Sequence, residues 1–127
     1  MAQFEKHFTV EEADALLPLI NSVLDAAEAL GSRMRDHQDE LDAVHERIPG
    51  NGGAAHGAEL AIVAEMIGRL VGSIQDKGMI VKDLEQGLID FPHWRDNREV
   101  FLCWQRGEKS VAYWHELDAG FRGRKPL

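Results

Sequence analysis

The spacing of the apolar residues changes at Gly78, and this change most constrains what the chain can fold into. Before Gly78, apolar residues recur every three or four positions, which is typical of a helix that packs lengthwise on another helix. After it, apolar and polar residues alternate, as they do in a strand with one buried face. The change predicts an α+β protein, with a long N-terminal antiparallel helical hairpin followed by a small antiparallel β-sheet of three or four strands.

Two helices are expected in the first part of the chain. Thr9 and Glu12 have the spacing of a capping box, so the first helix should begin there. Pro18 lies inside the helical pattern and removes a backbone donor, which predicts a kink or a break. The glycine-rich stretch Pro49–Gly57 reads as a turn, and the second helix should span residues 59–77.

The two expected helices differ in length. At a rise of 1.5 Å per residue, the first would run about 58 Å and the second about 30 Å. Part of the apolar stripe on the first helix would then have no partner within the hairpin. We therefore expect a non-enzymatic interaction module without a cofactor, which forms a four-helix or coiled-coil homodimer or binds another protein. Its interaction face would be formed by Leu17, Ile20, Leu24, Met34 and Leu41.

Four strands can be placed after Gly78, and Pro92 should end the second of them. They would span residues 79–84, 88–91, 99–105 and 110–116. A three-residue turn that ends at Gly87 would place Lys82 opposite Asp90 and give a cross-strand ion pair.

An alternative function is a metal-binding or small-ligand site on this sheet, possibly a catalytic one. Thiolate, imidazole and carboxylate groups together suit Zn²⁺ or another divalent transition metal. The candidate residues are Asp90, Cys103, Glu108 and His115, with His93 and Glu116 as further donors and Lys82 and Arg124 as charge partners.

Register decides whether these residues can meet. An even-length turn centred on Gly107 and Glu108 would put Cys103 opposite Ala112, with Cys103 and His115 on opposite faces of the sheet. A one-residue bulge would bring the two together. Without it, a buried apolar cysteine and a hydrogen-bonded histidine are the simpler interpretations.

Composition limits the remaining possibilities. The 127 residues should form a single domain, with the hairpin in residues 9–77 and the sheet and tail in residues 78–127. The net charge of −8 argues against nucleic-acid binding, and no apolar run is long enough for a membrane helix. One cysteine and the lack of a signal-peptide pattern predict a cytoplasmic protein.

Three runs, VKDLEQGLIDFP, LCWQRGE and YWHELDAGFRGR, closely resemble an uncharacterised bacterial family known only as domain of unknown function 2203. The start FTVEEA at Phe8 also resembles the opening of the family. The likeness is densest between Gly78 and Arg124 and covers nearly the whole chain. Because the family has no established activity, the resemblance supports the expected fold and implies no mechanism. The matching positions include Lys82, Asp83, Asp90, Phe91, Pro92, Cys103, Trp104, Gly107, Glu108, Trp114, His115, Gly120, Phe121 and Arg124.

Overall fold

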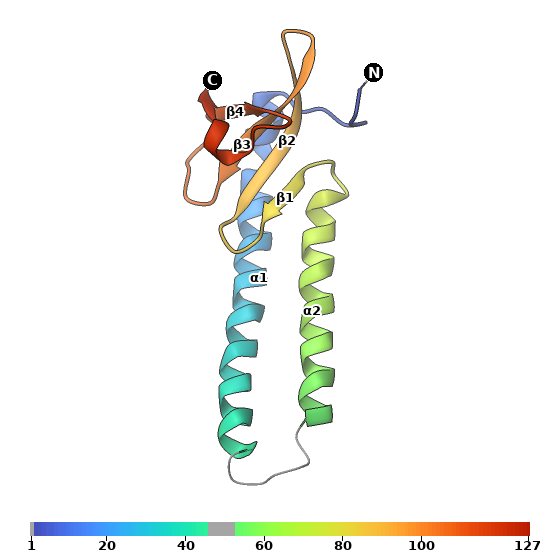
Figure 1. The fold of residues 1–127 in the computed structure, drawn as a ribbon, viewed down its shortest axis with the longest axis vertical. Helices are drawn as coiled ribbons and strands as arrows, with labels where there is room; N and C mark the ends of the chain where they lie inside the picture. The colour runs from blue at the N-terminus through green and yellow to red at the C-terminus, as the bar shows by residue number, and fades with distance from the viewer. Residues whose placement is uncertain (1, 46–52) are drawn as a thin grey trace.

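The computed structural model describes residues 2–45 and 53–127, without the side chains of residues 37, 38, 40–45 and 53–56. Two helices, α1 (Val10–His45) and α2 (Gly53–Gln75), lie side by side as a long antiparallel hairpin (Figure 1). The capping box forms as predicted: the Thr9 N–H donates to Glu12 Oε1 at 2.9 Å, and the Glu12 N–H donates to Thr9 Oγ1 at 3.1 Å. The second helix starts earlier than expected, inside the predicted turn Pro49–Gly57, part of which lies outside the described residues.

The sheet confirms the predicted α+β class, although among the described residues it has five strands rather than three or four. The strands follow one another in chain order, and every neighbouring pair is antiparallel. A short 3₁₀ helix, η1 (Phe121–Gly123), precedes the last strand. The strands are β1 (Ile80–Asp83), β2 (Leu88–Arg95), β3 (Arg98–Gln105), β4 (Tyr113–Glu116) and β5 (Lys125–Pro126).

β2 runs through Pro92, so the prediction that this proline ends the strand was wrong. The Pro92 carbonyl accepts the Phe8 N–H at 2.7 Å on the side of β2 that faces away from β3. Because the proline nitrogen points to the same free side, no hydrogen bond of the β2–β3 ladder is lost. The hairpin then turns at Asp96 and Asn97, whose φ angles of 51° and 62° are those of a two-residue type I′ turn.

The core lies between one face of the sheet and the first half of α1. Side chains alternate along β2 and β3, and Ile89, Phe91 and Leu102 join the helical residues in one buried cluster. We call this the inner face of the sheet. Figure 1 shows the sheet at the end of the hairpin where α1 extends beyond α2.

The sheet therefore covers most of the α1 face that was expected to bind a partner. Leu17, Ile20 and Leu24 are buried in the core, with exposed fractions of 6%, 0% and 2%. Met34 is half-buried in the hairpin, and the side chain of Leu41 lies outside the described residues. The part of α1 that extends beyond α2 therefore packs against the sheet of the same chain.

α1 continues through Pro18 without the break that the sequence allowed. A proline inside a helix costs roughly 3 kcal/mol, because it removes a hydrogen bond and crowds the preceding turn. Leu17 and Ile20, on either side of it, are both buried against the sheet. Their packing is what offsets the cost and keeps the helix continuous.

Replacing Ile20 tests whether the sheet covers this part of α1. Ile20→Ala should lower the free energy of unfolding by about 2–5 kcal/mol, because it leaves a cavity in a packed core. Leu19→Ala is the control: Leu19 is 40% exposed, and the change should stay within about 1 kcal/mol. Urea unfolding measures both, and equally small losses would show that this face of α1 is free.

Candidate metal centre on the outer face of the sheet

The face of the sheet that points away from the helices carries a buried polar cluster. Asp90, Cys103 and His115 have exposed fractions of 2%, 0% and 1%. They are buried although α1 packs on the other face of the sheet. One donor atom from each residue, a carboxylate oxygen, the thiol sulfur and an imidazole nitrogen, lies within 4.8 Å of the other two. Three of the four residues predicted as metal or small-ligand ligands are therefore brought together.

Strand register explains why the cluster forms. Cys103 pairs with Asp90 on β2 and with Tyr113 on β4, and cross-strand partners share a face. His115 lies two positions beyond Tyr113, so it points to the same side as Cys103. The predicted pairing of Cys103 with Ala112, which separated the cysteine from the histidine, was wrong by one residue.

The connection between β3 and β4 causes this difference. A tight turn forms one residue earlier than predicted, centred on Arg106 and Gly107, with the Glu108 N–H donating to the Gln105 carbonyl at 3.0 Å and Gly107 at φ 101°. β4 begins only at Tyr113, so residues 109–112 follow the turn outside any strand. These additional residues allow an odd shift in register that a tight hairpin would not.

His115 is oriented by hydrogen bonds on both ring nitrogens. Nδ1 lies 2.7 Å from the backbone carbonyl of Glu116, and a carbonyl can only accept, so Nδ1 carries a proton. Nε2 faces the Asp90 carboxylate, with distances of 3.2 Å and 3.1 Å to its two oxygens. Burial would lower the pKa of His115, but the hydrogen bonds to Asp90 and Glu116 outweigh it and raise that pKa above its usual value.

Cys103 is held as a neutral thiol. Burial, together with the negative charge of Asp90, raises the pKa of the Cys103 thiol to about 12. A thiol in this state is a poor nucleophile at neutral pH. Its sulfur becomes a strong ligand only where a cation displaces the proton.

Lys82 lies close to Asp90 as predicted, but the two residues are not cross-strand partners. The register pairs Ile80, rather than Lys82, with Asp90, and it shifts between Val81 and Asp83. Lys82 lies at this irregularity, with Nζ 4.0 Å from Asp90 Oδ2 and 4.9 Å from the centre of the Phe101 ring. It therefore covers one side of the cluster.

The N-terminal segment covers another side, which sequence reasoning missed. The ring of Phe4 packs on Phe101 at 5.3 Å, and Phe101 in turn lies 5.5 Å from the His115 ring. Glu99 fixes this segment by accepting the Phe4 N–H at 3.0 Å and contacting His7 Nε2 at 2.8 Å. These residues are more than ninety positions apart, and no local pattern marks their contact.

The other predicted site residues lie outside the cluster. Glu108 accepts the Gln105 N–H at 2.7 Å and the Arg124 guanidinium at 2.6 Å, so Arg124 pairs with Glu108 rather than with Asp90. His93 Nδ1 contacts the Phe8 carbonyl at 2.6 Å. The Glu116 side chain binds Arg98, and only its backbone carbonyl serves the cluster.

The chain belongs to the family described as "Uncharacterized conserved protein (DUF2203)", whose model matches residues 6–127. That description assigns no activity. The chain matches no curated protein and no solved structure. Within the described residues, the helices are too short or too polar to cross a membrane.

The Asp90–His115 pair should give the metal-free protein a defined pH dependence. A raised pKa means that the pair's contribution to stability is fully present below the ordinary histidine pKa and is lost as pH rises through the folded-state value. The difference in unfolding free energy between the wild type and His115→Gln should therefore shrink as the pH rises above the ordinary histidine pKa of about 6.5. Urea unfolding after chelator treatment measures it, with His93→Gln as the control. A difference that stays constant with pH would contradict the ion pair.

Proposed function

We propose that this protein binds a divalent transition metal ion, with Zn²⁺ as the best match, through Asp90, Cys103 and His115. The observation that carries the proposal is the convergence of three different donor atoms within 4.8 Å on a buried face of the sheet. Zinc accepts this mixture of thiolate, imidazole and carboxylate ligands. The same convergence favours this function over a site that also uses Glu108, whose carboxylate is occupied elsewhere.

The distances suit a metal ion after small movements. Ligand atoms around a tetrahedral zinc lie roughly 3.3–3.6 Å apart, given bond lengths of about 2.0–2.3 Å. His115 Nε2 and the Asp90 oxygens are at 3.1 Å and 3.2 Å, and all three donors lie within 4.8 Å. Side-chain adjustments of about 1 Å would therefore complete a three-ligand site.

The surroundings also resemble those of a metal-bound histidine. In such sites the nitrogen that does not bind the metal usually donates to a carbonyl or a carboxylate, which fixes the ring. The His115 Nδ1–H makes this contact with the Glu116 carbonyl at 2.7 Å. Nε2 is thereby presented to Asp90 and Cys103.

Charge balance supports the same assignment. Metal binding must displace the Cys103 proton, because the pKa of about 12 keeps the free thiol neutral. The incoming cation would replace that proton and the one on His115 Nε2. The Lys82 side chain is 42% exposed, so its charge can turn towards water when a cation reaches Asp90.

Metal content tests the proposal directly. The untagged wild-type protein should retain about one zinc ion per chain, and Cys103→Ser and His115→Gln should each retain much less, because three ligands share the binding free energy. Native mass spectrometry with elemental analysis measures the ratio. His93→Gln is the matched control and should keep the metal. A metal-free wild type that takes up no added zinc would refute the proposal.

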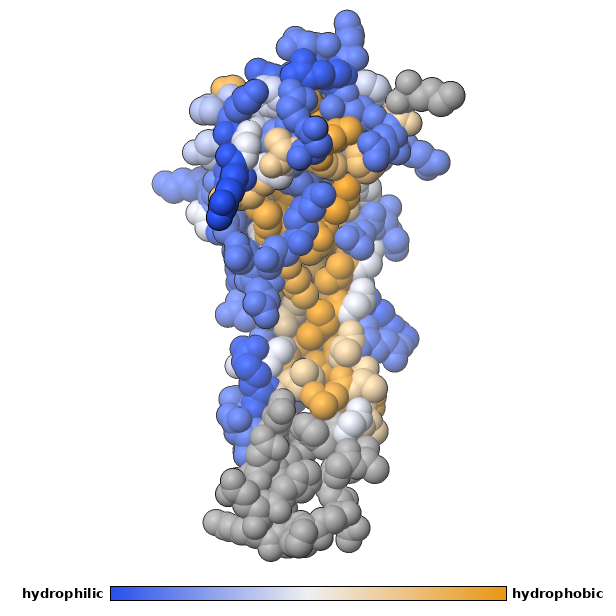
Figure 2. Space-filling view, in the orientation of Figure 1, coloured by the Kyte–Doolittle hydropathy of each residue, from blue (hydrophilic) through white to orange (hydrophobic). Residues whose placement is uncertain are grey.

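A second candidate function is self-association through the part of the hairpin that the sheet does not cover. Figure 2 shows an apolar band on one face of the hairpin, and self-association would use the groove on the opposite face. A groove of about 620 Å³ between the helices is lined partly by Ala29, Leu30 and Met66. Met66 is 45% exposed and nearby Ile62 is 58% exposed. A second copy of the hairpin could cover this surface and form a four-helix dimer.

Light scattering coupled to chromatography tests this second function. The wild type should elute with the mass of a dimer at micromolar concentration, and Met66→Glu should give monomers, because a charge would be buried in the contact. Leu19→Glu is a control on an exposed position of α1 outside the groove. A monomeric wild type across the concentration range would end this candidate.

A further inference from the structure

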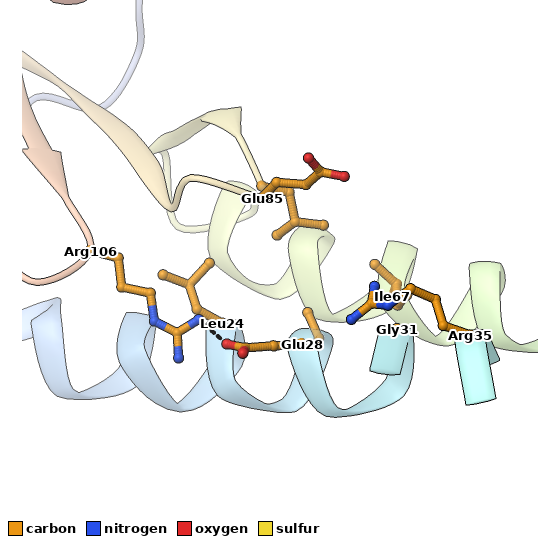
Figure 3. Close-up of a pocket in the computed structure, with 9 residues that line it drawn as sticks. Leu24, Glu28, Gly31, Arg35, Ile67, Glu85 and Arg106 are labelled. Carbon is orange, nitrogen blue, oxygen red and sulfur yellow. Dashed lines mark hydrogen bonds and ion pairs between the residues drawn. The ribbon is translucent and has the colours of Figure 1, made fainter. Parts of the chain in front are cut away.

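A second pocket lies where the helical hairpin meets the sheet (Figure 3), and it shares no residue with the metal centre. Its volume is about 660 Å³, within the range of small-molecule sites. α1, α2 and the turn between β1 and β2 all contribute to its wall. We propose that this pocket binds a small amphipathic molecule with a carboxylate group.

The body of such a molecule would contact an apolar wall. Leu24 of α1 and Ile67 of α2 face the pocket, and Leu84 closes it from the turn. Leu24 is almost fully buried, so this part of the wall is fixed by the core. An alkyl or aromatic group placed here would exchange water for apolar contacts.

Two arginines border the pocket, and only one of them is free to bind an anion. Arg106 is neutralised by two acids of α1, Asp25 and Glu28, and its Nη1 lies 2.7 Å from Glu28 Oε2. Arg35 has no ion-pair partner among the described residues. Figure 3 shows its guanidinium extending back along α1 towards Gly31, while the Glu85 carboxylate points away from both helices. The unpaired positive charge is thus at one end of the apolar wall.

Gly31 leaves room beside this guanidinium. Glycine inside a helix is less favourable than alanine, because it loses more backbone freedom on folding. A Cβ at Gly31 would meet a single atom within 4 Å, Arg35 Nη1 at 3.5 Å, so the backbone packing does not require glycine here. A ligand could use the space that a larger side chain would fill.

A carboxylate is the group that this arrangement recognises best. Guanidinium binds carboxylates through two parallel hydrogen bonds, and Arg35 offers these donors beside the apolar wall. A neutral apolar molecule would gain only the wall contacts. We therefore expect the carboxylate to contribute a distinct share of the affinity, which depends on Arg35.

Calorimetric titration of the full chain with octanoate and with octanol tests the proposal. Arg35→Gln should weaken octanoate binding about tenfold or more and leave octanol binding nearly unchanged, because only the carboxylate needs the charge. Gly31→Leu should weaken both ligands by filling the pocket. Arg33→Gln removes the same charge from the same helix, but Arg33 lines the opposite groove, so it should change neither.

Three results would overturn the proposal. One is the lack of saturable octanoate binding up to millimolar concentration. Another is an equal loss of octanoate affinity in Arg33→Gln and Arg35→Gln, which would mean that octanoate responds to the net charge of the helix and not to Arg35 itself. The third is weaker octanoate binding at protein concentrations where the chain is a dimer, which would mean that a second copy of the chain fills the pocket. Zinc content should be the same in all four proteins, so failure here is separable from failure of the metal site.

Discussion

The packing of the inner face of the sheet on the first half of α1 is the constraint on which the rest of the structure depends. It requires alternate side chains in the central part of β2 and β3 to be apolar and to point at the helix, as Phe91 and Leu102 do. The remaining side chains must then point outwards. On this outer face they include Asp90, Cys103 and His115, which are buried although α1 packs on the other face.

A buried polar cluster of this kind is costly unless its groups satisfy one another. An isolated carboxylate or imidazolium away from water would lose several kcal/mol of solvation. Here Asp90 has the His115 ring and the Lys82 ammonium as partners, and the second ring nitrogen has a carbonyl. The cluster is covered by Lys82 and by Phe101, on which the N-terminal segment packs. A metal ion would satisfy the same atoms and would also engage the thiol, which the ion pair leaves protonated.

The sequence predicted the parts of this fold that depend on local patterns. The capping box, the change of period at Gly78 and the turn that ends at Gly87 could all be predicted, because each depends on neighbouring residues. The prediction that Pro92 ends its strand failed, because the proline lies on the side of β2 that faces away from β3. The break that was one possibility at Pro18 does not occur, and α1 is continuous there.

The candidate site was harder to predict, since the residue types were identifiable but their register was not. Cys103 and His115 meet only because the connection after Gly107 shifts the strand pairing by one position. The contact of Glu99 with the N-terminal segment joins residues far apart in the chain. The sequence also did not predict that the sheet covers Leu17, Ile20 and Leu24, because the length of a helix does not show which element packs against it.

The central claim is that Asp90, Cys103 and His115 hold one metal ion. Anomalous X-ray scattering at the zinc edge, from crystals of the zinc-treated protein, would locate such an ion among the side chains. We expect one peak about 2.0–2.3 Å from His115 Nε2, the Cys103 sulfur and an Asp90 oxygen. No peak at this position, with the direct Asp90–His115 contact retained, would contradict the claim and leave the cluster as a buried ion pair.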